Sequence, residues 1–428
     1  MSLDRSLSPA LHPFAYPGLC QPETLRLSNG MVCKLFHQED YRIIRLDIRV
    51  EAGACYQSEP GLALAAVKML QEGTETHPLE SWMECLDYEG AFIELTSNRD
   101  TACISVHFPV EAAAPVLGLL KEMLACPQFS AERLHIVQVQ QQQTLAIHAE
   151  KTAYVAYRAL SEALFGATHP YGSHLKGKDV DAWNPVRIAA FFKRQYVPSA
   201  MCVYVAGNMS QAFRLQLDQT LGTLPEGRKS DAPLVATVLR EARRERIAKA
   251  GSVQSSICMG RIVCNRTHPD WMRLCITNRI LGGYFGSRLM TEIRERSGLA
   301  YGIYSHVLSL RHAGMLYIAA DVNAEAEAEA VSKIRKELLR LCEEDMPEEE
   351  LRLVKQYESG AMLRSFDGLF AQMERCMDVD AYGMDTAYWD RYFRILAEFT
   401  CADVREMARK YLHPDLMSEI VVGPPLNA

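Results

Sequence analysis

The second half of the sequence repeats a pattern of the first, and this repeat constrains the fold more than any other feature. Three pairs of segments carry it: Lys121–Leu124 and Lys336–Leu339, Ser130–Leu134 and Pro347–Leu351, Pro198–Gly207 and Pro414–Gly423. Counted between the first residues of each pair, the intervals are 215, 217 and 216 residues. Chance could supply one such pair, whereas three at nearly one interval indicate a duplicated domain.

Each copy combines short strands with longer helices. In the first copy, alternating apolar residues around Asn29-Gly30 predict a hairpin within 23–36. Further strands are predicted at 43–50, 91–95, 102–108 and 201–206, and helices at 61–70, 81–88, 115–124, 131–148, 153–164 and 185–195. Segregated strands and helices predict two α+β domains. The predicted boundaries are an arm over 1–22, an N-terminal domain over 23–224, a linker over 225–245 and a C-terminal domain over 246–428.

Composition and charge narrow the classes of function. Of the 428 residues, 48% are hydrophobic and 23% are charged, which is typical of a soluble globular protein. The net charge of -7 gives no basic surface for nucleic acid or anionic lipid. No apolar run reaches the roughly 18 residues of a membrane-spanning helix. We therefore expect neither nucleic-acid binding nor membrane insertion.

The number and spacing of the cysteines indicate the cellular compartment of the protein. All 13 are scattered without a Cys-x-x-Cys pair, and the odd number leaves at least one unpaired. Reduced thiols in a reducing compartment are therefore expected in place of a disulfide framework. The first residues show no apolar core of a signal peptide. We predict a cytoplasmic protein, and a periplasmic location stays open because a chain trimmed of its leader would look the same.

Chemistry is expected in residues 281–301, where a glycine turn, a short charged helix and an aromatic strand follow one another. Gly282 and Gly283 are predicted to end a preceding helix. Ser287 is a predicted side-chain cap of the next helix, and Gly298 is predicted to end it. This stretch therefore forms a helix-to-strand junction.

Arg294 and Tyr301 lie seven residues apart on the two sides of this junction. Taken alone, they read as a surface arginine and a tyrosine packed at a strand edge. The surrounding pattern of Leu-Gly-Gly, Ser-Arg-Leu, Glu-Ile-Arg-Glu and Gly-Leu-Ala-Tyr resembles the C-terminal half of the insulinase (pitrilysin) family of zinc metallopeptidases. The resemblance extends over nearly the whole chain. It implies two homologous α+β domains, each a mixed or antiparallel sheet flanked by helices, that form a clamshell. It also implies that Arg294 and Tyr301 bind substrate opposite the zinc.

The metal-binding motif of that family is missing. Active members carry His-x-x-Glu-His on the first helix, where two imidazoles one turn apart hold zinc and the glutamate is the general base. The matching positions are Leu64, Val67 and Lys68, and Thr144 stands where the third ligand, a glutamate, is expected. Leucine and valine cannot coordinate zinc, and the lysine ammonium repels it. No metal is therefore expected on this chain.

A second departure concerns the stretch Gly90–Thr101, which resembles the strand that pairs with substrate in active members. The family's Asn-Ala pair is replaced by Glu94-Leu95. The replacement resembles the non-zinc, α-type subunits of mitochondrial processing peptidase. We therefore predict a half-buried structural strand.

In the two-chain branch of the family, one chain supplies the zinc site and the other supplies the arginine and the tyrosine. The resemblance thus implies a non-zinc subunit of a heterodimeric zinc metalloendopeptidase, with a His-x-x-Glu-His partner subunit that binds the zinc. Tyr301 would donate to the oxyanion of the tetrahedral intermediate, and Arg294 would hold a carbonyl or carboxylate of the peptide.

Two other classes stay open. A catalytically inactive structural or peptide-binding protein would resemble the core subunits of the respiratory cytochrome complex. An independent enzyme with unrelated chemistry is the third reading, since the members of a Ser-His-Asp or Cys-His site meet only in space. Whether the isolated chain forms a homodimer is also left open.

Overall fold

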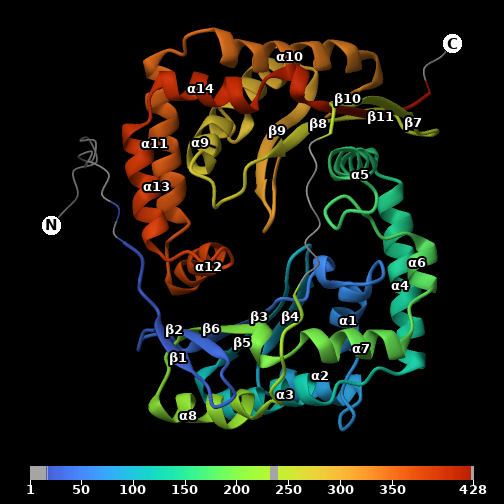
Figure 1. Cartoon of the computed structure of the whole chain (residues 1–428), viewed down its shortest axis with the longest axis vertical. Helices are drawn as coiled ribbons and strands as arrows, with labels where there is room; N and C mark the ends of the chain where they lie inside the picture. Colours follow the sequence, from blue (N-terminus) through green and yellow to red (C-terminus); the bar gives the residue numbers. More distant parts are fainter. Residues whose placement is uncertain (1–15, 17, 232–239, 426–428) are drawn as a thin grey trace, which may run out of the picture.

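Two β-sheets lie in opposite halves of the molecule, and helices flank each of them (Figure 1). The computed structural model describes residue 16, residues 18–231 and residues 240–425. The first sheet contains β1 (Glu23–Arg26), β2 (Val32–His37), β3 (Ile43–Val50), β4 (Phe92–Ser97), β5 (Ala102–Pro109) and β6 (Met201–Gly207). The second contains β7 (Arg244–Ala248), β8 (Gln254–Val263), β9 (Ala300–Ser309), β10 (Gly314–Asn323) and β11 (Ser418–Gly423).

The order of the strands is nearly the same in both sheets. It is β1-β2-β6-β3-β5-β4 in the first and β7-β11-β8-β10-β9 in the second. Apart from β1, the two orders correspond strand for strand. The parallel pairs, β2 with β6 and β7 with β11, stand at the same place in each. The predicted fold class, two homologous α+β units with mixed sheets and flanking helices, is therefore confirmed.

The six helices predicted in the first half agree with the structure to within two residues, whereas α6, α8 and most helices of the second half were not predicted. The helices are α1 (Leu62–Leu70), α2 (Leu79–Tyr88), α3 (Ala113–Ala125), α4 (Ala131–Ala149), α5 (Thr152–Phe165), α6 (Gly177–Asp181), α7 (Pro185–Gln195) and α8 (Gln211–Thr220) in the first half. In the second half they are α9 (Trp271–Gly282), α10 (Glu327–Glu343), α11 (Glu348–Arg364), α12 (Leu369–Asp380), α13 (Ala387–Glu398) and α14 (Cys401–Tyr411). A π-helical turn, η5, covers Met290–Arg296. Short 3₁₀ turns cover Ala54–Tyr56, Val110–Ala112, Pro198–Ala200, Leu221–Thr223, Ala324–Ala326 and Pro414–Leu416.

Side-chain caps explain where several helices begin. The Ser130 hydroxyl accepts a hydrogen bond from the Arg133 backbone nitrogen at 3.2 Å, which satisfies one free N–H at the start of α4. Thr400 and Asp403 form a reciprocal capping box at the start of α14. These ends are therefore set by local sequence.

The two halves exchange one helix each. Helix α5 belongs to the first half of the chain but packs on β8 and β11 of the second sheet. Helix α12 belongs to the second half but packs on β6 of the first sheet, where Leu369 and Met373 are buried against Phe36 and Tyr204. The two helices are equivalent in the repeat, since they begin at 152 and 369, an interval of 217 residues. Each half is thus covered by a helix of the other.

Polar contacts also join the halves. The Arg311 side chain binds a carboxylate oxygen of Glu51 at 2.9 Å and the hydroxyl of Tyr56 at 3.0 Å. Its backbone nitrogen donates to Asp100 at 3.0 Å. These contacts join the β9–β10 turn of the second sheet to the first half.

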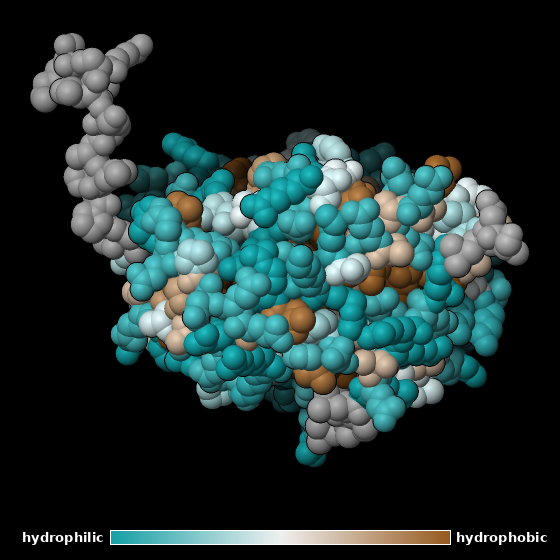
Figure 2. Space-filling model, turned by 90° about the horizontal axis from the view of Figure 1, so that it is seen from above, coloured by the Kyte–Doolittle hydropathy of each residue, from teal (hydrophilic) through white to brown (hydrophobic). Residues whose placement is uncertain are grey.

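The sequence predictions on domain boundaries, 23–224 and 246–428, stay predictions. Most of the predicted arm and residues 232–239 of the predicted linker lie outside the described residues. Within the described ranges, none of the helices combines the length and the apolar character that crossing a lipid bilayer requires. The face seen in Figure 2 is mostly hydrophilic, with hydrophobic side chains in separate small areas.

Candidate functional site

The segment that follows α9 turns sharply before β9 begins. A Cβ atom at Gly282 would lie 2.8 Å from the backbone nitrogen of Ser305, so only glycine lets the end of α9 pack this closely on β9. Gly298 has a φ of +61° and ends the η5 turn, as predicted. The predicted cap at Ser287 is wrong. Its hydroxyl is buried and makes no hydrogen bond to the described residues, while its carbonyl accepts from Thr291.

A β-bulge at the start of β9 sets the direction of Tyr301. Ala300 pairs with Val322 and Ile303 pairs with Ala320, so that Tyr301 and Gly302 together face the single residue between them on β10. Simple alternation would place Tyr301 on the same side as the buried Ile303. Because the extra residue turns the strand, Tyr301 is instead 90% exposed on an edge strand of the sheet.

Arg294 and Tyr301 meet at this bulge. The guanidinium carbon of Arg294 lies 5.1 Å from the ring centre of Tyr301 and 4.9 Å from that of Phe285, which is 61% exposed. Such cation–π contacts orient an arginine without using its N–H groups. Among the described residues, Arg294 forms no ion pair, and the Tyr301 hydroxyl forms no hydrogen bond. The donors of both side chains are therefore not used by the described residues.

The other two arginines of this stretch are already paired. Arg288 binds Glu350 of α11 through two hydrogen bonds of 2.7 and 2.9 Å. Arg296 lies 3.5 Å from Glu292 on the same turn. Arg288 and Arg296 thus have carboxylate partners, and Arg294 has none among the described residues.

The positions that match the metal motif do not form a metal site. Val67 is buried in the core at 3% exposure, while Leu64 and Lys68 are half-buried on the same helix, α1. Thr144 is exposed on α4, and its hydroxyl donates to the carbonyl of Gln140 at 2.9 Å. Within 18–231 and 240–425, no group of three or more histidine, cysteine, aspartate or glutamate side chains is placed to hold a metal ion. These residues do not fit zinc.

A histidine near α1 is no replacement ligand. His174 and Leu64 line the same cavity of about 300 Å³. The Nε2 atom of His174 donates to the carbonyl of Arg158 at 3.1 Å. Burial lowers the pKa of His174 to about 3, with the charges of Arg99 and Arg158 adding to the effect. The ring is therefore neutral, and its Nε2 proton is already used.

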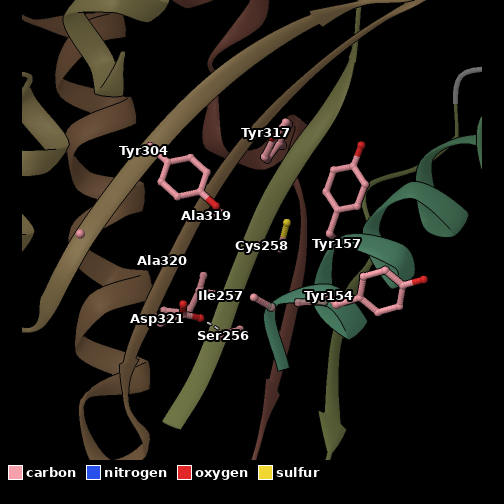
Figure 3. A pocket seen from close by; sticks show the side chains of 13 residues that line it. Tyr154, Tyr157, Ser256, Ile257, Cys258, Tyr304, Tyr317, Ala319, Ala320 and Asp321 are labelled. Atoms are coloured by element: carbon pink, nitrogen blue, oxygen red, sulfur yellow. Dashed lines mark hydrogen bonds between the residues drawn. The ribbon is translucent and has the colours of Figure 1, made fainter. Parts of the chain in front are cut away.

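A tyrosine-lined cavity beside β9 was not predicted. It has a volume of about 310 Å³ and lies between α5 and the strands β8, β9 and β10 of the second sheet (Figure 3). Its four tyrosines are Tyr154, Tyr157, Tyr304 and Tyr317. Two come from a helix of the first half and two from strands of the second, so the sequence places them far apart. The exchange of α5, which brings them together, leaves no local sequence signal.

Comparison with known proteins bears on the junction that carries Arg294 and Tyr301. Residues 182–357 match the model of the peptidase M16 inactive domain. This stretch resembles the peptidase M16 family. The matched segment contains the junction and ends long after it, whereas α1, with the positions of the missing metal motif, lies outside the match.

Several known proteins are similar to most of the chain. Over 354 residues the chain is 23% identical to the uncharacterized zinc protease YmxG of Bacillus subtilis, with 81% of this chain and 85% of that protein covered. It is 24% identical over 324 residues to the non-peptidase homolog YmxG of Helicobacter pylori, which covers 74% of each chain. The crystal structure of a peptidase M16 inactive domain from Pseudomonas fluorescens has the same fold, with a TM-score of 0.88, 23% identity and coverage of 95% of this chain and 98% of that one.

Proposed function

We propose that this chain is the non-zinc subunit of a heterodimeric zinc metalloendopeptidase. It would bind the peptide substrate, and a partner subunit with His-x-x-Glu-His would bind the zinc. The observation that supports this most is the state of Arg294 and Tyr301. Arg294 on the η5 turn contacts Tyr301 on the edge strand β9, and neither uses its hydrogen-bond donors within the described structure.

Peptide hydrolysis needs donors of this kind. As water adds to the scissile carbonyl, negative charge builds on the carbonyl oxygen, and a donor aimed at that oxygen stabilises the transition state. The Tyr301 phenol would donate to this oxyanion. Arg294, held by two aromatic rings, would bind a neighbouring carbonyl or a carboxylate of the peptide through its free N–H groups. The Lewis acid that peptide hydrolysis of this class requires would come from the zinc of the partner subunit.

The edge strand itself supports a role in peptide binding. β9 has no neighbour on its outer side within the described sheet, so its backbone groups can pair with an extended peptide. β4 is the corresponding edge strand of the first sheet. Its residues are alternately exposed and half-buried, so this strand, predicted to be structural, is also accessible from solvent.

The test compares the chain alone, a zinc-bearing His-x-x-Glu-His subunit alone, and an equimolar mixture. Bound zinc and cleavage of a long peptide are measured for each. The proposal expects zinc only in samples that contain the second subunit, and cleavage that rises sharply in the mixture. Zinc bound by the chain alone, or chelator-resistant cleavage by it, would contradict the proposal.

A second candidate is a catalytically inactive protein that binds peptides or has a structural role. The name of the Helicobacter pylori relative, a non-peptidase homolog, favours it. In that case the mixture would show no gain in cleavage, while substitutions at Arg294 would still weaken binding of a peptide.

A further inference from the structure

The exchanged helices create one slot in each half of the molecule. In the second half, the slot is lined by α5 and by β8, β10 and β9, and in the first half by α12 and by the equivalent strands β3, β5 and β4. Each slot holds a cavity, of about 310 Å³ under α5 and about 270 Å³ under α12. The two cavities are therefore counterparts in a duplicated fold, and their linings can be compared directly.

The slot under α12 is lined by charges that pair with each other. Arg45 binds Asp47 at 2.8 Å and Glu374 of α12 at 2.5 Å. Arg375 binds Asp378 at 3.0 Å on the same helix. Burial of charged groups is favourable only with such partners. The lining of this slot is thus largely satisfied by its own side chains.

The slot under α5 contains no such ion pair among the described residues. Its four tyrosines form no hydrogen bond through their hydroxyls to the described residues. In Figure 3, Tyr304, Tyr317 and Tyr157 stand around the cavity, while Tyr154 points away from the strands. Tyr157 and Tyr317 meet edge to face, with ring centres 5.4 Å apart. This lining is aromatic, with unused polar groups.

One charged residue lines the cavity under α5, and it is negative. Asp321 is exposed on β10 and accepts a hydrogen bond from Ser256. Burial raises the pKa of Tyr317, and burial together with the charge of Asp321 raises that of Tyr304, so these phenols stay neutral at physiological pH. Aromatic faces and a carboxylate both attract a cation. The cavity therefore has the chemistry of a cation-binding site.

The cavity also lies beside the site described above. Asp321 is the residue that faces Tyr301 and Gly302 across the bulge, and Gly302 lines the cavity. A peptide paired with β9 would present alternate side chains to this face of the sheet. The geometry points to a pocket for the side chain of a lysine or arginine in a peptide bound next to Tyr301. This inference rests on the proposed peptide-binding function.

The test has one arm that needs a peptide and one that does not. In the first, fluorescein-labelled decapeptides that differ at one central residue, lysine, norleucine or phenylalanine, are titrated into the full chain. In the second, N-acetyl-lysine methylamide and N-acetyl-norleucine methylamide are titrated into protein with ¹³C-labelled tyrosine. Tyr304→Phe and Tyr317→Phe assign the tyrosine signals.

The lysine probes are expected to bind roughly two- to tenfold more tightly than the norleucine probes and to shift the signals of Tyr304 and Tyr317. Asp321→Asn should remove most of this difference. Glu94→Gln is the matched control, because Glu94 is an exposed strand carboxylate that lines the slot under α12. It should leave the difference unchanged.

Equal binding of the lysine and norleucine probes, tighter binding of phenylalanine, or an effect of Glu94→Gln equal to that of Asp321→Asn would overturn the pocket. If the decapeptides do not bind but N-acetyl-lysine methylamide shifts the two tyrosines, the pocket stands and the peptide-binding function fails. If the peptides bind without preference and Arg294→Met weakens them, the function stands and the pocket fails.

Discussion

The two halves share one sheet order but differ in which polar groups they leave unpaired. In the first half, the charges under α12 bind each other, and Val67 is buried at the position of the missing general base. In the second half, the half-buried Arg294 and the exposed Tyr301 lie beside a cavity of tyrosines whose hydroxyls bind no described residue. Buried apolar faces are enough to maintain a duplicated architecture. The hydrogen-bond donors left unpaired in the second half therefore make that half the better candidate to bind a ligand.

The largest effect is expected at the exposed tyrosine of the second half. Tyr301→Phe removes the proposed oxyanion donor, so kcat of the two-chain peptidase should fall by roughly 10² to 10³. Tyr88→Phe is the matched control in the first half, because Tyr88 is 89% exposed and makes no described hydrogen bond. Steady-state kinetics on a long peptide measures both. Equal turnover of Tyr301→Phe and the wild type would remove the functional difference between the halves.

A smaller effect, on stability, is expected in the slot under α12. Arg45→Met leaves Asp47, which is 1% exposed, without its charged partner. We expect the free energy of unfolding to fall by roughly 2 kcal/mol, less than for a fully buried pair because Arg45 is partly exposed and Ser105 still binds Asp47. Urea denaturation measures the change. A variant as stable as the wild type would show that the paired charges do not hold this slot together.

Acid should loosen α12 before α5. Burial opposes ionisation of Asp380, but hydrogen bonds from Lys34 and Tyr204 outweigh it and hold the pKa of this α12 carboxyl below its usual value. A lowered pKa gives stability that is present above about pH 4 and is lost as the pH falls through the folded-state pKa. We compare hydrogen exchange at about pH 6 and pH 3, each relative to the intrinsic exchange rate at that pH. On going to pH 3, α12 should lose more protection than α5, which packs beside neutral tyrosines. The same loss of protection in both helices would contradict this contrast, and Asp380→Asn should reduce it.

The smallest effect is expected in the slot under α5. Tyr317→Phe removes a hydroxyl that binds no described residue and keeps the ring that contacts Tyr157. The free energy of unfolding should change by less than about 0.5 kcal/mol. Thermal and urea denaturation check this. A loss near that of Arg45→Met would mean that the two slots are equally important to the fold, and that the tyrosine cavity is structural.

The sequence predicted most of the elements but not how the halves combine. The repeat, the hairpin at Asn29-Gly30 and most helix bounds follow from local patterns, and the fold class follows from them. The apolar face of α5 predicts that this helix is buried, but it does not say on which sheet, so the exchange of α5 and α12 was missed. The tyrosine cavity was missed with it.

The candidate site was predicted in part. The seven-residue spacing and the family resemblance singled out Arg294 and Tyr301, and the structure brings the two side chains together. The bulge that exposes Tyr301 depends on the register between β9 and β10, which single-strand patterns do not reveal. The Ser287 cap failed because the turn buries this hydroxyl away from the free N–H groups of the helix.

The exchange of α5 and α12 also limits how this chain can move. If the two sheets swung apart within one chain, α5 would leave β8 and β11, or α12 would leave β6, and the apolar side chains between them would meet water. If this chain pairs with a zinc-bearing subunit as proposed, opening and closing around a peptide would therefore occur between the two chains, and this chain would move as a rigid body.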